Sequence, residues 1–498
     1  MTSIPKRSEV SQENTWDLSG LFQNDEAWNA GLAEYEKLAE EIPSFQGTLG
    51  RSADHLADYL DFSNSFGLLE ERLAYYADLR QTEDEGDNTS RTMNGKFMMA
   101  AAKANAAGAW ANPEIQAIPS ESMDAFLKSP RMEEYRIFLQ KILRYKPHIL
   151  SDKEERLLAI HAEGEDIAHD TFSVLTNVDV KFGSVRTPEG EKPLSQSTWS
   201  VFMESPDRAL RKEAYDKFYA QFEAHNTTLA SLYGGSVKKD VIKARIRNFP
   251  SARAAALFPD DVPESVYDNL VDTINKNLEP LHRYYALRKK ALKVEELRHY
   301  DVYVPIVPKA IKTTSWEEAV DIIAKALAPL GDEYVNTLRN GLLTDRWADR
   351  YENQGKRSGA FSAGSYTGNP YILMNYKDDS IRDMFTMAHE GGHSMHSYYS
   401  AKANPFMHYG YTIFEAEVAS TFNEELLFHY LLKNADSREL KAYLVNKRVD
   451  DLLATLYRQT MFAEFEKRSH KLEEGGTPLT SDVLRGEYRK LLQRYFGP

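Results

Sequence analysis

The sequence predicts a mainly α-helical protein with a small antiparallel β-sheet, and three observations support this prediction. Long segments repeat apolar residues at spacings of three and four, which is typical of helices that bury one face. Strand patterns are confined to short stretches that contain glycine and proline. The 498 residues are 42% hydrophobic, enough for a large core, and the length favours two to four domain-sized units.

The amino-terminal part predicts helices over residues 25–42, 53–77 and 88–111, separated by acidic or small turns. The residue before Pro113 disfavours continuation of a helix, so a boundary is expected there. We predict an amino-terminal helical domain over residues 1–112 and a catalytic helical domain over residues 113–498. Further helices are expected over residues 120–127, 132–145, 151–173, 206–231, 233–246, 263–292 and 316–327.

Three short stretches predict extended structure. Residues 181–193 indicate a hairpin with a Pro-x-Gly turn, and residues 300–307 indicate a short strand or an extended connector. Residues 359–376 hold two extended runs around a Gly-Asn-Pro turn, for which a small antiparallel sheet is the simplest fold.

Residues 381 to about 401 predict a helix that carries His389-Glu390-Gly391-Gly392-His393. Residues four apart lie one above the other on a helix, so His389 and His393 can bind one zinc ion. Glu390 is displaced around the helix, where it can act as the general base on a zinc-bound water. Two histidines on an apolar face can also be hydrogen-bonded core residues.

A catalytic zinc site needs a third protein ligand, and a second predicted helix, residues 414–427, offers carboxylates. Phe414, Val418, Phe422 and Leu426 form its apolar stripe. Glu417 is the carboxylate nearest the stripe, so we predict it as the third ligand. Glu424 lies two turns further along the same face. It is a candidate hydrogen-bond acceptor for a metal-binding residue or, alternatively, the third ligand itself.

Two residues on the first helix are candidates for support of the ligands. His396 is seven residues from His389, about 10.5 Å along the axis, which is too far to share the ion. A role behind the ligands or toward substrate and a structural hydrogen bond are both open for it. Asp383 is a candidate partner for a ligand imidazole, since metal-bound histidines commonly require a carboxylate or carbonyl.

The hairpin directly before the metal helix is a candidate substrate-binding edge. A peptide can add to an exposed sheet edge through backbone hydrogen bonds. Gly364 and Ser365 lack bulk, which favours such an approach, and Tyr366 follows them. The alternative is a purely structural hairpin that braces the helix.

Composition limits the partners of this protein. The net charge of −14 without a basic run argues against nucleic acid. The start of the chain has no apolar segment of the kind that exports a protein or spans a membrane. The chain contains no cysteine, so any metal must be held by histidine and carboxylate. The lack of cysteine is also consistent with a reducing compartment.

The segments 389–397, 369–376 and 414–421, together with Thr15-Trp16-Asp17-Leu18, resemble the oligoendopeptidase F branch of the thimet-oligopeptidase-like zinc peptidases. The resemblance implies a mostly helical bowl or clam shape. It also implies a cytoplasmic endopeptidase that acts on short, unstructured peptides with one zinc ion per chain. His389, His393 and Glu417 would bind this ion, with Glu390 as the base.

Similar family members continue beyond the position of Pro498 with a segment that carries a histidine and several tyrosines. We therefore expect the chain to lack this carboxy-terminal segment, with Tyr409, Tyr411 or His408 as alternative donors to an oxyanion. A zinc dipeptidyl carboxypeptidase and a catalytically silent peptide-binding protein remain alternative functions. The oligomeric state is not predicted.

Overall fold

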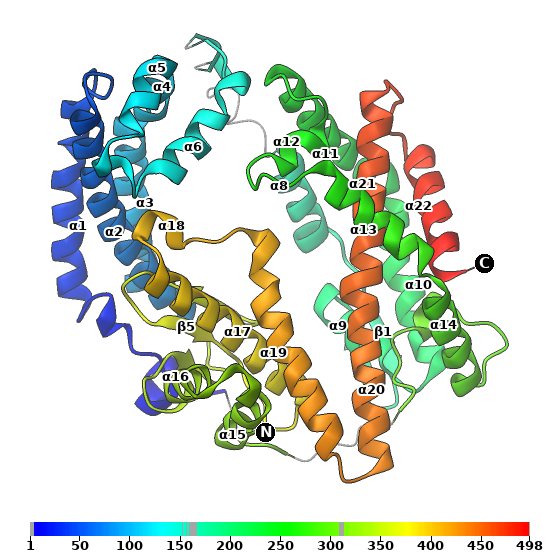
Figure 1. Cartoon of the computed structure of the whole chain (residues 1–498). Coiled ribbons are helices and arrows are strands. Elements are labelled where there is room, and N and C mark those ends of the chain that lie inside the picture. The colour runs from blue at the N-terminus through cyan, green and yellow to red at the C-terminus, as the bar shows by residue number, and fades with distance from the viewer. Residues whose placement is uncertain (1–3, 152, 156, 159–166, 308–312, 498) are drawn as a thin grey trace. The chain divides into compact units, whose positions relative to one another are not determined.

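The computed structural model describes residues 4–151, 153–155, 157–158, 167–307 and 313–497. The chain forms two compact units, each assembled from two stretches of sequence (Figure 1). Unit 1 comprises Met1–Lys146 and Ile311–Asp436, and unit 2 comprises Pro147–Ala310 and Ser437–Pro498. Residues on both sides of position 112 lie in unit 1, and the boundary expected there stays a prediction.

Unit 1 consists of helices and one three-stranded sheet. Its helices are α1 (Asp25–Ala39), α2 (Ala53–Glu83), α3 (Asn88–Gly108), α4 (Ala111–Ala117), α5 (Ser120–Phe126), α6 (Arg136–Arg144), α15 (Trp316–Ala326), α16 (Asp332–Leu343), α17 (Ile381–Ala403), α18 (Phe406–Tyr409) and α19 (Ile413–Asn434). Its strands are β3 (Ala348–Asp349), β4 (Phe361–Gly364) and β5 (Pro370–Leu373).

Unit 2 is helical apart from one hairpin. Its helices are α8 (Ile167–Val174), α9 (Gln196–Met203), α10 (Arg208–Ala224), α11 (Asn226–Ile246), α12 (Ala252–Leu257), α13 (Glu264–Lys276), α14 (Glu279–Leu292), α20 (Arg438–Leu452), α21 (Gln459–Glu474) and α22 (Ser481–Phe496). The hairpin pairs β1 (Ser184–Thr187) with β2 (Gly190–Pro193).

The predicted mainly α-helical architecture is confirmed, with local differences. The helices expected over residues 206–231 and 233–246 are instead α10 and α11, with the break at His225. The helix expected over residues 263–292 is interrupted between α13 and α14, because Pro280 lacks an N–H and its ring would clash with the carbonyl one turn earlier in a continuous helix, so it lies in the first turn of α14. Residues 300–307 form a connector, one of the two structures expected there, and it begins with the 3₁₀ turn η8 (His299–Asp301). The helix expected over residues 151–173 lies in part outside the described residues.

The sheet of unit 1 has the order β3-β5-β4. β4 and β5 form the expected antiparallel hairpin, and β3 adds to β5 as a parallel strand that the sequence did not predict. Tyr371 and Leu373 of β5 are buried in the core shared by α1, α2 and α3, and the sheet also packs against α17. The sheet therefore joins the amino-terminal helices to α17.

Residues 15–17 run along the segment that leads into this sheet. The Arg346 side chain donates to the carbonyl oxygens of Thr15 and Trp16 at 2.9 Å each. The Asp17 N–H donates to the Arg346 carbonyl at 2.8 Å. Distant parts of the sequence are thus joined within unit 1.

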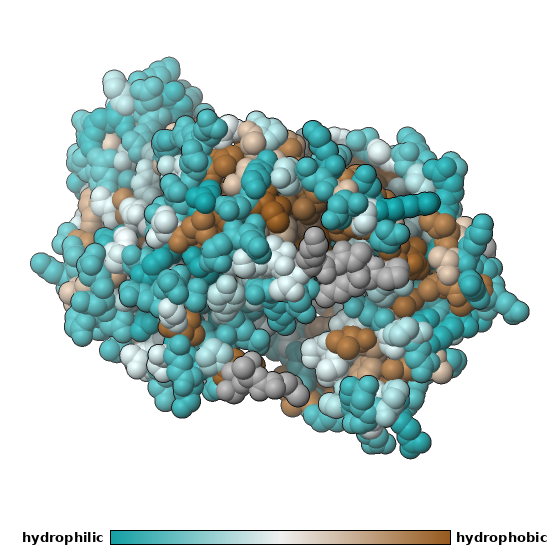
Figure 2. Space-filling model, turned by 90° about the horizontal axis from the view of Figure 1, so that it is seen from below, coloured by the Kyte–Doolittle hydropathy of each residue, from teal (hydrophilic) through white to brown (hydrophobic). Residues whose placement is uncertain are grey.

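The surface is mainly hydrophilic, with scattered apolar patches on the face shown in Figure 2. No helix within the described ranges is both long enough and apolar enough to cross a membrane.

Candidate metal centre

α17 begins at a polar cap and buries one face. The hydroxyl of Ser380 accepts from the Asp383 N–H at 3.3 Å and donates to its carboxylate at 2.8 Å. Ile381, Met384, Phe385 and Ala388 are buried on the side that packs into unit 1. This packing fixes the rotation of the helix, and the Nε2 atoms of His389 and His393 lie 3.2 Å apart.

α19 brings a carboxylate to these two imidazoles. It begins with a capping box in which Glu415 accepts from the Thr412 N–H at 2.9 Å. One turn later, Glu417 Oε2 lies 3.4 Å from His389 Nε2 and 3.5 Å from His393 Nε2. The Ser420 hydroxyl donates to the same oxygen at 2.7 Å, which holds the carboxylate in place.

Small residues line the contact between α17 and α19, and they allow the two helices to approach closely. A Cβ atom at Gly392 would lie 2.6 Å from the Ser420 Cα and 2.7 Å from the Ala419 carbonyl oxygen. Asn423 donates to the Ala388 carbonyl at 3.1 Å and joins the two helices further along. The contact therefore requires glycine at position 392, because any side chain there would push α17 and α19 apart.

The three donor groups fit a tetrahedral zinc ion. Ligands at 2.0 to 2.1 Å in tetrahedral geometry stand roughly 3.3 Å apart, and the observed separations are 3.2, 3.4 and 3.5 Å. Two imidazoles and one carboxylate are a donor set that zinc prefers, and they leave a fourth position open.

The apolar stripe that oriented α19 in the sequence interpretation is not buried. Phe414, Val418 and Phe422 are 59%, 68% and 52% exposed. The buried face instead carries Ser420, Asn423, Leu427 and Phe428. The prediction that this stripe marks the packed face was wrong, because close contact with α17 requires small and polar residues. Glu417, which was chosen by its position beside the stripe, nevertheless lies at the donor cluster.

Glu424 lies behind the first histidine. Its Oε1 is 2.6 Å from His389 Nδ1, on the side of the ring opposite the donor cluster. A carboxylate there favours a proton on Nδ1, which leaves the Nε2 lone pair for a metal. Burial lowers the pKa of His389, but the hydrogen bond to Glu424 and the neighbouring carboxylates raise it more.

Glu390 is buried beside the donor cluster, with only 7% of its surface exposed. Burial raises the pKa of Glu390 to about 7, while the charge of His389 and the Ser362 N–H oppose the rise. Ser362 belongs to β4, so the edge of the sheet and the candidate base are neighbours. A divalent cation at the cluster would favour the ionised carboxylate.

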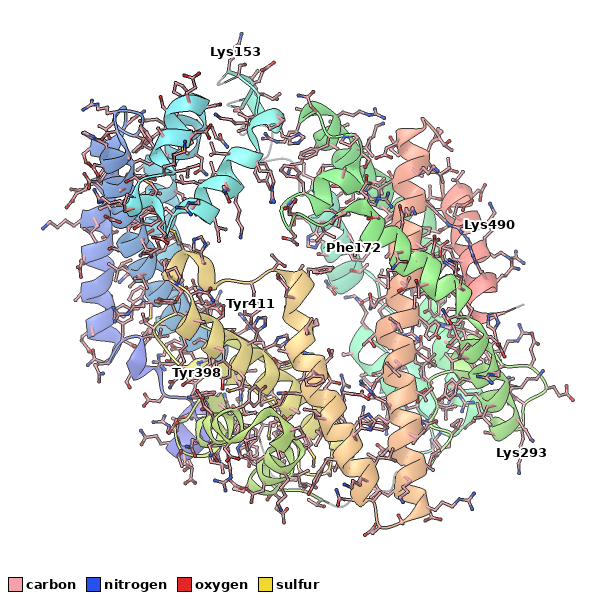
Figure 3. The ribbon with its side chains drawn as sticks, in the orientation of Figure 1. Lys153, Phe172, Lys293, Tyr398, Tyr411 and Lys490 are labelled. Atoms are coloured by element: carbon pink, nitrogen blue, oxygen red, sulfur yellow. The ribbon has the colours of Figure 1, made fainter. Side chains whose placement is uncertain are left out.

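Two candidate supporting residues do not contact the cluster. Asp383 accepts from Ser380 and from the Lys377 N–H at 2.9 Å, so its carboxylate caps α17 and is not directed to an imidazole. His396 stacks on Tyr411, with ring centroids 3.7 Å apart. Figure 3 labels Tyr411, which lies in the segment between α18 and α19. The Nδ1 of His396 is buried without a hydrogen-bond partner. Glu424 therefore occupies the place for which Asp383 was the candidate.

The candidate substrate residues lie where β4 and its turn pass α17. A Cβ atom at Gly364 would lie 2.1 Å from the Ser397 Oγ, so glycine allows the strand to approach the metal helix. Ser365 is buried, and its hydroxyl accepts from the Gly368 N–H at 3.0 Å. Its hydroxyl thus closes the turn.

Tyr366 and Tyr409 share a partner that the sequence analysis missed. The Tyr366 N–H donates to Glu71 of α2 at 2.7 Å, and the Tyr409 hydroxyl also donates to Glu71. The alternative oxyanion donors are engaged as well, since Tyr411 pairs with Ser397 at 2.9 Å and His408 with the Glu134 carbonyl at 2.7 Å. No local spacing could indicate Glu71, because 295 residues separate it from Tyr366.

Comparisons with known proteins find two matching family models and several similar relatives. Residues 201–498 match the model of peptidase family M3, and residues 114–182 match that of oligopeptidase F. The chain is 42% identical to oligopeptidase PepF of Bacillus subtilis, over 99% of its own length and 74% of the relative. It is also 42% identical to an oligoendopeptidase F homolog of Borreliella burgdorferi, over 99% of this chain and 82% of the relative.

The chain is also similar to a solved structure of an oligoendopeptidase F. The crystal structure of oligoendopeptidase-F from Enterococcus faecium aligns with a TM-score of 0.71 at 32% identity. The alignment covers 95% of this chain and 80% of that one.

Proposed function

Because this chain belongs to peptidase family M3 and is a metallo-oligopeptidase of the oligopeptidase F type, we propose that it is a zinc-dependent endopeptidase for short, unstructured peptides. The observation that carries the proposal is the convergence of His389, His393 and Glu417, with the buried carboxylate of Glu390 beside them. The matching relatives that are named oligoendopeptidases support internal cleavage.

His389, His393 and Glu417 would hold the zinc ion through Nε2, Nε2 and a carboxylate oxygen. When bound, zinc supplies Lewis acidity, which makes water a stronger acid and polarises a carbonyl group. Glu424 keeps the His389 ring in the tautomer that presents Nε2. The ligands are therefore held in two ways. Glu424 orients the ring of His389, and the contact between α17 and α19 positions Glu417.

Glu390 would carry the proton in the reaction. Its carboxylate takes a proton from the attacking water and returns it to the nitrogen of the leaving amine. β4 lies at the end of its sheet, and its Ser362 adjoins Glu390. An extended peptide paired with β4 would therefore bring a backbone carbonyl near the base, with little dependence on side chains.

Cleavage of an internally quenched peptide that is blocked at both ends tests the proposal. We expect cleavage that stops with a chelator and returns with zinc. Cleavage only of peptides with a free carboxyl end would favour the dipeptidyl carboxypeptidase alternative. Binding without any cleavage would favour the silent peptide-binding alternative.

Peptides are the substrate class that the family implies. A cytoplasmic location stays a prediction from the family resemblance, and the lack of nucleic-acid and membrane partners stays a prediction from the sequence.

A further inference from the structure

Unit 2 contains a guanidinium group with no carboxylate partner among the described residues. Arg458 is half-buried, and its guanidinium lies over the ring of Tyr303, with Cζ 5.6 Å from the ring centroid. By contrast, the buried guanidinium of Arg288 pairs with Asp450 at 3.3 Å. Arg458 therefore retains the capacity to bind an anion.

Three further tyrosines are close enough to Arg458 for its charge to act on their phenols. Tyr219, Tyr285 and Tyr488 donate no hydrogen bond to any described residue. Burial raises the pKa of each of the three phenols, and the charge of Arg458 opposes the rise in all of them. The guanidinium thus lies near three neutral donors and one aromatic face, a combination that suits an anion with apolar neighbours.

Two of the three donors and the ring of Tyr303 are held by two separate cores. Tyr285 and Tyr488 pack against the core formed by residues of α13, α14, α21 and α22, and Tyr303 packs against the core around β1 and α10. These rings lose little further freedom when a ligand binds, because packing already holds them.

The backbone around Arg458 is also unusual. Arg458 is the last residue of the π-helical turn η10 (Leu453–Arg458), which joins α20 to α21 (Figure 1). Such turns carry a cost in stability and occur frequently at functional sites.

We propose that Arg458, with Tyr303 and the hydroxyls of Tyr219, Tyr285 and Tyr488, binds the α-carboxylate of a peptide. A guanidinium pairs with a carboxylate through two parallel hydrogen bonds, and the phenols donate to its remaining lone pairs. The inference that the ligand is a peptide rests on the proposed function. The inference that an anion binds here rests only on residues of unit 2.

The test compares one fluorescent peptide with a free carboxyl end and with an amidated end. Binding is measured by anisotropy to the zinc-loaded Glu390→Gln protein, so that turnover does not interfere. We expect the free acid to bind about ten to a hundred times more tightly, as for hydrogen bonds to charged groups. Arg458→Gln should remove this preference without weakening the binding of the amide.

Arg485→Gln is the matched control, since Arg485 pairs with Glu223 on the surface of the same unit at 2.8 Å. It should keep the preference for the acid. If Arg458→Gln does not fold, Tyr488→Phe decides instead, because it keeps the ring and should reduce the preference severalfold.

Equal affinity of the unmodified chain for acid and amide would overturn the inference, as would an Arg458→Gln protein that still prefers the acid. Inorganic phosphate that displaces both peptides equally would identify a phosphate site and also overturn it. Cleavage without any preference for the acid contradicts only this inference. A preference for the acid without any cleavage contradicts only the proposed function.

Discussion

Glu390 and Glu424 show how neighbouring carboxylates acquire different tasks from their surroundings. Glu390 is buried next to the cluster, and its pKa of about 7 reflects a site that disfavours charge. Glu424 accepts a hydrogen bond from the ring of His389, which a carboxylate does best when ionised. One residue is thus suited to move a proton and the other to orient a ligand.

Glu390→Gln should retain zinc in near-stoichiometric amount and lose about a hundredfold to ten-thousandfold in turnover, because it removes the base and spares the ligands. Metal analysis together with cleavage of a quenched peptide measures both effects. Turnover at the unaltered rate would contradict the proposed mechanism.

Glu417→Ala should weaken zinc binding more than any other single carboxylate change, because it removes a ligand. Glu424→Ala should reduce zinc affinity by about 10- to 100-fold, as for residues that orient metal-bound histidines. Competition with a chromogenic chelator measures both affinities. Glu425→Ala is the control, since its carboxylate pairs with His429 at 3.0 Å.

A protein in which Glu424→Ala abolishes zinc binding while Glu417→Ala leaves it intact would reverse this ligand assignment.

At the scale of elements, the contact between α17 and α19 decides whether the cluster exists. Neither helix carries all three donors, so the distance between their axes sets the separation of Glu417 from the two imidazoles. Gly392 and Ser420 determine that distance through their lack of bulk. The exposed stripe of α19 plays no part in it.

Gly392→Ala should destabilise unit 1 by about 1–3 kcal/mol through overpacking and weaken zinc binding, because a Cβ atom would meet backbone of α19. Denaturant unfolding and zinc competition measure the two effects. Gly486→Ala is the matched control, since it also lies within a helix and its Cβ atom would meet nothing within 4 Å. It should stabilise α22 by up to about 1 kcal/mol. Equal effects of the two substitutions would show that helix propensity, not contact, decides the outcome.

At the scale of the whole chain, unit 1 depends on contacts between residues hundreds of positions apart. Arg7 pairs with Glu83 at 3.0 Å and with Asp349 at 2.6 Å, while Lys356 pairs with Asp349 at 2.7 Å. The side chains of Glu83, Asp349 and Lys356 are almost fully buried. This network joins the amino-terminal segment to α2 and to the segment before the metal helix.

Arg7→Met should destabilise the protein by about 3–5 kcal/mol, because it leaves buried carboxylates with too few partners. Lys6→Met removes the same charge from an exposed neighbouring position and should have little effect. The shift in the denaturant midpoint measures the difference, and equal shifts would contradict the role of the network.

The sequence by itself determined the helical class, the position of the α17 imidazoles and the hairpin before them. These follow from local rules, since spacing along a helix and turn chemistry act within a few residues. It did not determine which face of α19 is packed or the parallel strand β3. Glu71 and the Arg7 network also came only from the tertiary structure, because contacts between distant segments depend on how whole elements pack and leave no spacing in the sequence.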